Sequence, residues 1–166
     1  MKTIKVLCCE NTKILHKPGT WIIEQSEGTD FCHVAIQIDD FVYEAVFPKA
    51  RVIYQSNWDK QFKTVHEYDL VLEDEEYTVF MNEVLYQLGR PYSLIQLVLI
   101  WLSNCLGVWE SFINETIWNG NKALICSEFV GRPIASTKNY YFGKSLDTID
   151  LNDIKNCLDK IGYKVR

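Results

Sequence analysis

One cysteine of the chain stands where an apolar run changes into a polar pattern. In the stretch ALICSEFVG, Cys126 follows Ala-Leu-Ile and precedes Ser127 and Glu128. This pattern predicts that a helix begins near Cys126. Unpaired backbone N–H groups at a helix start favour a thiolate, and they also stabilise an oxyanion. Cys126 is therefore a candidate nucleophile, with a purely structural role as a small buried side chain as the alternative.

A predicted hairpin brings a histidine and a glutamate together. Two aspartates separate the β-rich runs FCHVAIQI and FVYEAVF, and this spacing is a hairpin signal. With a two-residue loop, Ile38 faces Phe41, and one face of the strand pair is apolar and expected to meet the core. The other face carries His33 and Glu44 as diagonal neighbours, within reach of each other. A shift of register by one residue would separate the two side chains, but it would also turn the apolar side chains of one strand away from the core.

A histidine that is held by a carboxylate is a general base for a nearby nucleophile. Cys126, His33 and Glu44 together would suit acyl transfer through a thioester, with the backbone N–H of Cys126 as part of the oxyanion hole. The alternative is structural, because a strand histidine is usually partly buried and hydrogen-bonded, and Glu44 could be a solvated residue. His16 and His66 are interpreted as exposed or structural histidines.

The cysteines do not form a metal-binding or disulfide pattern. They are Cys8, Cys9, Cys32, Cys105, Cys126 and Cys157. No CxxC pair occurs, the adjacent Cys32 and His33 lack ligand spacing, and the neighbours Cys8 and Cys9 are expected on opposite faces of a strand. We therefore expect free thiols in a reducing compartment, with neither a metal nor an organic cofactor.

The elements around these residues predict an α+β fold. Strands are expected over 4–9, 31–38, 41–47 and 51–56 and within 62–71, and helices over 21–28, 73–89, 94–106, 108–118, from Cys126 onwards and over 151–161. A β-rich first part and a helical second part are typical of an antiparallel sheet packed against helices. A length of 166 residues with 48% hydrophobic content suits a single domain, 1–166.

Several residues are expected to limit these helices. Gly89 and Pro91 should end the helix over 73–89, and Pro133 should end or bend the helix that starts near Cys126. Asp150 is a good N-cap and Gly162 a good stop for the last helix.

Charge and hydropathy narrow the classes of partner. A net charge of −5 argues against a non-specific nucleic-acid binder. The N-terminal apolar stretch is shorter than the roughly 7–15 residues of a signal-peptide core, so cytoplasmic synthesis is expected. The longest apolar run, 94–102, is shorter than the roughly 18 residues of a membrane span. We expect 94–118 to be core, with an acyl-binding or membrane-facing surface as the alternative. The oligomeric state is left open.

Three motifs, in this order, resemble a known superfamily. FCHVAIQIDDFVYEAVFPKARVIYQSNW, then LGRPYS, then ICSEFV are similar to the circularly permuted papain-like cysteine peptidases and amidases. The resemblance is to the NlpC-type group in its YiiX-like branch, which is related to the lecithin–retinol acyltransferases. In this branch the histidine strand comes first and the cysteine helix last. The link between GRPY and Cys126, residues 93–125, is longer than is usual in cell-wall peptidases of this type.

The resemblance implies a function and one further site residue, and the strand pattern adds another. It implies a papain-like cysteine hydrolase with the triad Cys126, His33 and Glu44. Tyr92, in GRPY, matches a tyrosine that lines the family's site, so it is a candidate substrate or oxyanion contact, as is Gln37 on the His33 face.

Three functions are considered, two of which are enzymatic and differ in substrate. The first choice is an amide or isopeptide bond, in particular of a peptidoglycan stem peptide. A lipid ester or thioester is the second choice, and a non-enzymatic binding module is the third. A wall enzyme without a signal peptide would fit a phage-encoded protein, released by lysis or carried in a virion, whereas an intracellular amidase needs no export.

Overall fold

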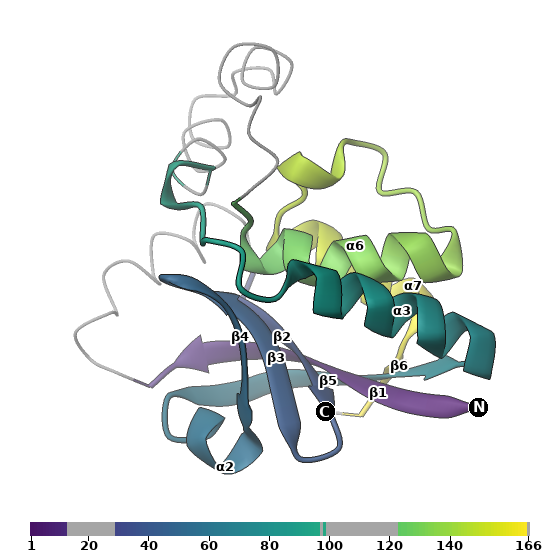
Figure 1. Cartoon of the computed structure of the whole chain (residues 1–166), viewed down its shortest axis with the longest axis horizontal. Coiled ribbons are helices and arrows are strands. Elements are labelled where there is room, and N and C mark those ends of the chain that lie inside the picture. The colour runs from purple at the N-terminus through teal and green to yellow at the C-terminus, as the bar shows by residue number, and fades with distance from the viewer. Residues whose placement is uncertain (13–28, 97, 99–122, 166) are drawn as a thin grey trace.

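A six-stranded antiparallel sheet, in the order β4-β3-β2-β1-β5-β6, forms the body of the protein (Figure 1). The computed structural model describes residues 1–12, 29–96, 98 and 123–165. The strands are β1 (Lys2–Asn11), β2 (His33–Ile38), β3 (Phe41–Val46), β4 (Lys49–Tyr54), β5 (Phe62–Leu72) and β6 (Tyr163–Lys164). The helices with bounds are α2 (Gln55–Trp58), α3 (Asp74–Gln87), α6 (Cys126–Lys138) and α7 (Leu151–Ile161), with a 3₁₀ turn, η2, at Leu146–Thr148. The predicted α+β class and antiparallel sheet are confirmed.

The hairpin of β2 and β3 has the predicted register. Gln37 pairs with Val42 and Ile38 with Phe41, and Asp39 occupies the turn with a positive φ of 51°. Aspartate is one of the few residues other than glycine that adopt this left-handed conformation readily. The two-residue loop thus sets which side chains share a face, as the sequence predicted.

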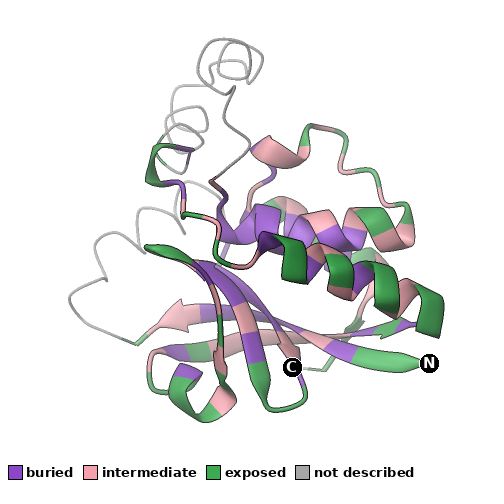
Figure 2. Cartoon of the chain, viewed as in Figure 1, coloured by how far each residue is buried: buried purple, intermediate pink, exposed green. Residues whose placement is uncertain are grey.

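The sheet carries a core on each face. α3 and α6 lie over one face, and α2 lies on the other side (Figure 1). The larger core includes Cys8 of β1 and residues of α3, α6 and α7, whereas the smaller one includes Cys9, Trp58 of α2 and Phe62 of β5. The buried residues run through the middle of the sheet and along the facing sides of the helices (Figure 2). Cys8 and Cys9 therefore point to opposite faces, as expected for neighbours on a strand.

The predicted helix starts and stops are largely observed. α3 begins with a capping box between Glu73 and Glu76. Asp150 caps α7 by accepting a hydrogen bond from the Asp153 backbone N–H at 2.9 Å, and Gly162 is its C-cap. The short helix α2 and the strand β6 were not predicted from the sequence.

Pro133 was predicted to end or bend the helix that starts near Cys126, and the structure shows that it does not end α6. The helix continues to Lys138, and Asn139 closes it in the left-handed conformation. A proline has no N–H for the carbonyl four residues earlier, which here is that of Phe129. The side-chain amide of Gln87, on α3, donates to this carbonyl at 3.2 Å. A neighbouring helix therefore supplies the hydrogen bond that the proline cannot make.

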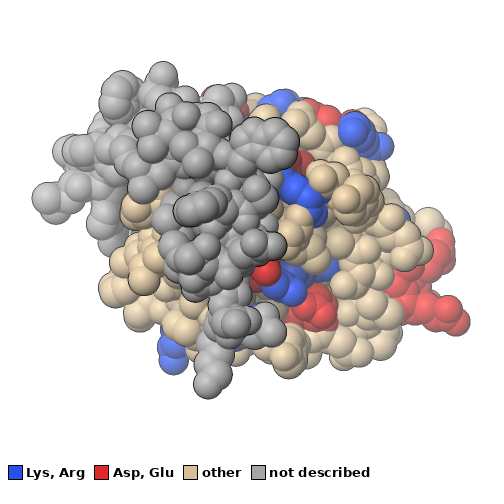
Figure 3. Space-filling view, turned by 90° about the horizontal axis from the view of Figure 1, so that it is seen from above, with Lys and Arg blue, Asp and Glu red and all other residues tan. Residues whose placement is uncertain are grey.

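Several predicted elements lie outside the described residues. These are the helix over 21–28 and nearly all of the segments 94–106 and 108–118. At the start of the first segment, residues 94–96 and 98 are helical. No helix among the described residues is long and apolar enough to cross a membrane. On the described surface seen from above, basic and acidic side chains are interspersed (Figure 3).

Candidate active site

Three adjacent strands and one helix start place the candidate residues. His33 is the first residue of β2, Glu44 lies in β3 and Arg51 lies opposite Glu44 in β4. Cys126 is the first residue of α6. Because β2, β3 and β4 are neighbours in the sheet, residues that are distant in sequence meet at the end of the sheet where α6 begins.

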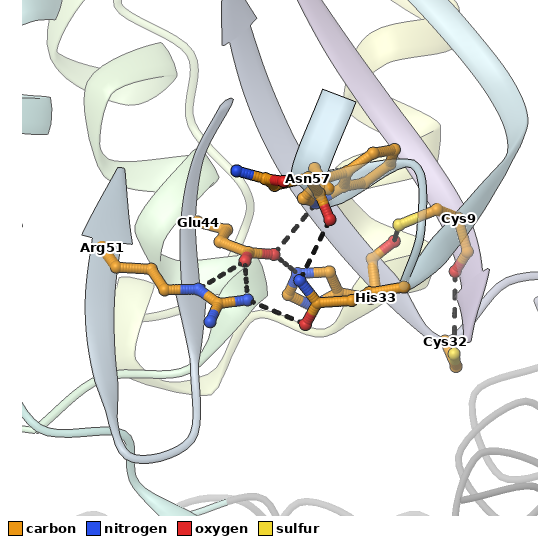
Figure 4. A network of polar contacts seen from close by, with 8 residues as sticks. Cys9, Cys32, His33, Glu44, Arg51 and Asn57 are labelled. Carbon is orange, nitrogen blue, oxygen red and sulfur yellow. Dashed lines mark hydrogen bonds and ion pairs between the residues drawn. The ribbon is translucent and has the colours of Figure 1, made fainter. Parts of the chain in front are cut away.

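Glu44 is fully buried and both of its carboxylate oxygens are occupied (Figure 4). Oε2 lies 2.9 Å from Nε2 of His33 and accepts from the Trp58 indole N–H at 3.1 Å. Oε1 accepts from Nε of Arg51 at 2.8 Å and lies 2.6 Å from Nη2 of the same residue. Three side chains therefore hold this carboxylate in one orientation.

These contacts keep Glu44 ionised. Burial alone raises the pKa of Glu44, but the hydrogen bonds and charges of His33 and Arg51 outweigh burial and hold the pKa below its ordinary value. A buried carboxylate without such partners would become protonated instead. Glu44 therefore presents a negative charge to His33 at neutral pH.

The His33 ring interacts with both Glu44 and Cys126. The ring of Phe62 stacks on the His33 ring, with ring centroids 4.8 Å apart and an interplanar angle of 21°. Burial lowers the pKa of His33, but hydrogen bonds and Coulombic attraction to Cys126 and Glu44 outweigh burial and raise that pKa to about 10. Since Nε2 faces Glu44, Nδ1 is the ring nitrogen that remains for the sulfur. The imidazole is therefore oriented by Glu44, and its partners favour its charged form.

Cys126 is buried, with 5% of its surface exposed. The preceding residue, Ile125, is the N-cap of α6 and provides no side-chain hydrogen bond. The first backbone N–H that bonds within the helix is that of Phe129, which donates to the Ile125 carbonyl at 3.0 Å. Within the described residues, the N–H groups of Cys126, Ser127 and Glu128 thus remain without acceptors, as is usual for the first helical turn. They form a set of donors beside the sulfur.

The two polar residues after Cys126 anchor the helix rather than join the site. Ser127 donates from its hydroxyl to the Ile149 carbonyl at 2.8 Å. Glu128 pairs with Arg132 at 2.7 Å and accepts from the Gln96 amide at 3.1 Å. Both side chains are buried. The polar pattern that follows Cys126 in the sequence therefore fixes the start of α6.

The two further candidates have different positions. Tyr92 bridges to Leu124, close before Cys126, and lines a pocket of about 360 Å³ together with Arg51 and Phe62. Gln37 lies near the turn end of β2, where its side-chain amide donates to the Asp39 carbonyl at 3.1 Å. The structure brings Tyr92 towards the His33–Glu44 pair and leaves Gln37 away from it.

Three other cysteines, Cys8, Cys9 and Cys157, are less suited to nucleophilic chemistry. Burial raises the pKa of Cys8 and of Cys9, and it raises that of Cys157 to about 12. Such thiols stay protonated at neutral pH. None of the described His, Cys, Asp and Glu residues forms a group of three or more that could hold a metal ion.

Neither a protein-family model nor a curated protein matches this chain. Assignment to the permuted papain-like superfamily therefore rests on the three motifs and on the geometry of His33, Glu44 and Cys126, and it is part of the proposal below.

Sequence reasoning missed three contributors to the site: Arg51, Trp58 and Phe62. Arg51 could have been found, because a two-residue turn at Phe47-Pro48 places it opposite Glu44, by the same counting that paired the first hairpin. No comparable local signal marks Trp58 or Phe62, since their contacts depend on how α2 and β5 fold back over the sheet.

Proposed function

We propose that this protein is a papain-like cysteine hydrolase of the permuted NlpC type, which cleaves an amide or isopeptide bond through a thioester on Cys126. The observation that carries this proposal is that His33 interacts both with the Glu44 carboxylate, 2.9 Å away, and with Cys126 at the start of α6. A nucleophile, a base and a residue that orients the base are the minimum set for this chemistry.

In the first half of the reaction, the Cys126 thiolate attacks the carbonyl carbon of the substrate. The carbonyl oxygen becomes an oxyanion, and the unpaired N–H groups of the first turn of α6 stabilise it. His33 then gives its proton to the leaving amine nitrogen as the C–N bond breaks. The products of this half are a free amine and an acyl thioester on Cys126, with His33 neutral.

In the second half, water replaces the amine. His33 takes a proton from the water as its oxygen attacks the thioester carbonyl. The tetrahedral intermediate collapses by breaking the C–S bond, which releases the acid and returns the thiolate. His33 is protonated again, so the sum of both halves is the addition of one water to the amide bond. Glu44 keeps the ring oriented throughout.

A peptide substrate is the first choice, with a peptidoglycan stem peptide as the specific candidate. The order of the three motifs supports it, as does the position of Tyr92 in the pocket beside the His33–Glu44 pair. Phage-encoded or bacterial origin belongs to the same proposal.

A lipid acyl ester or thioester is the second candidate, and a separate observation favours it. Leu94, Ile95 and Val98, at the beginning of the apolar 94–118 segment, are 50%, 65% and 52% exposed. Exposed apolar side chains that are close together are typical of a surface that meets lipid or another protein.

The test is a cysteine-directed acyl probe followed by peptide mapping, with turnover measured on a peptidoglycan peptide and on a long-chain acyl ester. We expect the label on Cys126 and cleavage of the peptide. Liposome co-sedimentation together with cleavage of the ester alone would favour the lipid substrate. Absence of both labelling and turnover would contradict the hydrolase and leave the binding module.

A further inference from the structure

The pocket beside the His33–Glu44 pair has aromatic walls and a cationic end. Its aromatic rings belong to Phe47, Phe62 and Tyr92, and its polar side chains to Asn11, Arg51 and Gln61. Phe62 stacks on His33 and Arg51 binds Glu44, so two residues that line the pocket contact two of the proposed catalytic residues. None of the described residues that line it carries a carboxylate.

Arg51 has two edges with different surroundings. Nε and Nη2 face Glu44, and Nη2 also donates to Oε1 of Gln61 at 3.3 Å (Figure 4). The contacts of Arg51 with the described residues leave Nη1 and its two N–H groups unused. The side chain is 34% exposed, whereas Glu44 has no exposed surface. The pocket therefore meets the cation, while the carboxylate that balances it is shielded.

We propose that this pocket is a subsite for a free carboxylate of the substrate, which binds Nη1 of Arg51 while the adjoining carbon chain packs against Phe47, Phe62 and Tyr92. A planar guanidinium matches a carboxylate in shape and charge, and aromatic rings accommodate the apolar part of a ligand. This inference rests on the proposed function, which it narrows to acyl compounds that carry an acidic group away from the scissile bond.

The experiment compares two matched series of esters on the full chain. One contains mono-p-nitrophenyl esters of adipic, pimelic and suberic acid, and the other the same compounds with the free carboxylate capped as a methyl ester. These lengths avoid the cyclisation that makes shorter monoesters hydrolyse by themselves. For at least one length, we expect kcat/KM to be about tenfold or more higher for the free acid, the size of one charge-assisted hydrogen bond.

Variants assign the preference to the pocket. Phe47→Glu adds a negative charge to the wall without touching Glu44, so it should remove the preference for the free acid, whereas Phe47→Gln should retain it. Arg51→Gln should lower turnover of both series, because Arg51 also holds Glu44, and it should bring the ratio close to one.

Binding of pimelate, measured by calorimetry, tests the subsite without turnover. Binding that Phe47→Glu abolishes supports the subsite even if neither ester is cleaved. The subsite would be overturned if both series were cleaved at equal rates at every length and pimelate did not bind. If that turnover still depended on Cys126, the proposed hydrolase would stand. Turnover that persists in Cys126→Ala would overturn the proposed function instead.

Discussion

At the scale of single residues, Glu44 orients the His33 ring and stabilises its charged form. Its two oxygens receive donors from His33, Trp58 and Arg51, so neither rotation nor protonation of the carboxylate is favoured. A buried carboxylate with this many partners orients the ring and stabilises its charged form.

The substitution Glu44→Gln tests this role. Glutamine keeps the shape but removes the charge, and its amide NH₂ would face donors. We expect kcat/KM to fall about 10²- to 10⁴-fold. The pKa of His33 should fall because one of its two stabilising partners is lost, so the alkaline limb of the pH–rate profile should move to lower pH. An unchanged limb would show that Glu44 does not act through His33. Trp58→Phe, which removes one donor to Glu44, should also lower kcat/KM, but by a smaller factor.

The substitution Cys126→Ala tests the nucleophile. We expect no turnover above background from a folded protein, while Cys157→Ala keeps turnover, because Cys157 lies buried in α7. In the wild type, iodoacetamide should label Cys126 faster than Cys157 at neutral pH, since burial raises the pKa of Cys157 to about 12. Equal labelling rates, measured by mass spectrometry of peptides, would contradict the assignment.

At the scale of elements, the contact between α3 and α6 keeps α6 continuous past a proline. Gln87 donates to the Phe129 carbonyl, whose helical partner Pro133 cannot provide. Both Gln87 and Phe129 are fully buried. A carbonyl without a donor in such a place costs about 1–3 kcal/mol.

A double-mutant cycle between Gln87 and Pro133 measures this contact. Gln87→Ala should destabilise the protein through the lost hydrogen bond and the cavity that it leaves. In the background of Pro133→Ala, residue 133 regains an N–H for the Phe129 carbonyl, so the cost of Gln87→Ala should be lower by about 1 kcal/mol. Urea denaturation of the four proteins gives the coupling. Additive effects would show that Gln87 acts only by packing.

At the scale of the whole molecule, the site links stability to pH. The pKa of His33 rises from 6.5 to about 10 on folding, so its contribution is fully present below pH 6.5 and is lost as pH rises towards 10. The pKa of Glu44 is lowered from 4.5, so its contribution is present above pH 4.5 and is lost as pH falls. Both contributions to stability are therefore fully present between pH 4.5 and pH 6.5.

Urea denaturation from pH 4 to 10 in the wild type and in Cys126→Ala tests the link. We expect wild-type stability to decline between pH 6.5 and 10, and to decline less in the variant, because the sulfur no longer supports the imidazolium. Cys8, Cys9 and Cys157 also titrate near pH 9 in the unfolded chain, so the difference between the two proteins isolates the His33–Cys126 pair. A difference that does not change with pH would contradict the link.

The sequence by itself determined the local geometry of the site. Alternation of apolar residues and a two-residue turn set the register of β2 and β3, and this register put His33 and Glu44 on one face. The start of α6 at Cys126 and the cap of α7 at Asp150 followed from local patterns as well. Such features are predictable because each depends on residues that are close together in the sequence.

Only the tertiary structure decided what surrounds that geometry. The Trp58 donor to Glu44, the Phe62 ring on His33 and the Gln87 bond across Pro133 all join elements that are distant in sequence, and no local period encodes such contacts. Gln37 shows the converse, because it shares a strand with His33 yet lies too far along it to join the site. The pocket and the free edge of Arg51 exist only once β4, β5 and the Tyr92 segment pack together, since a cavity is a property of packed surfaces rather than of any one stretch of chain.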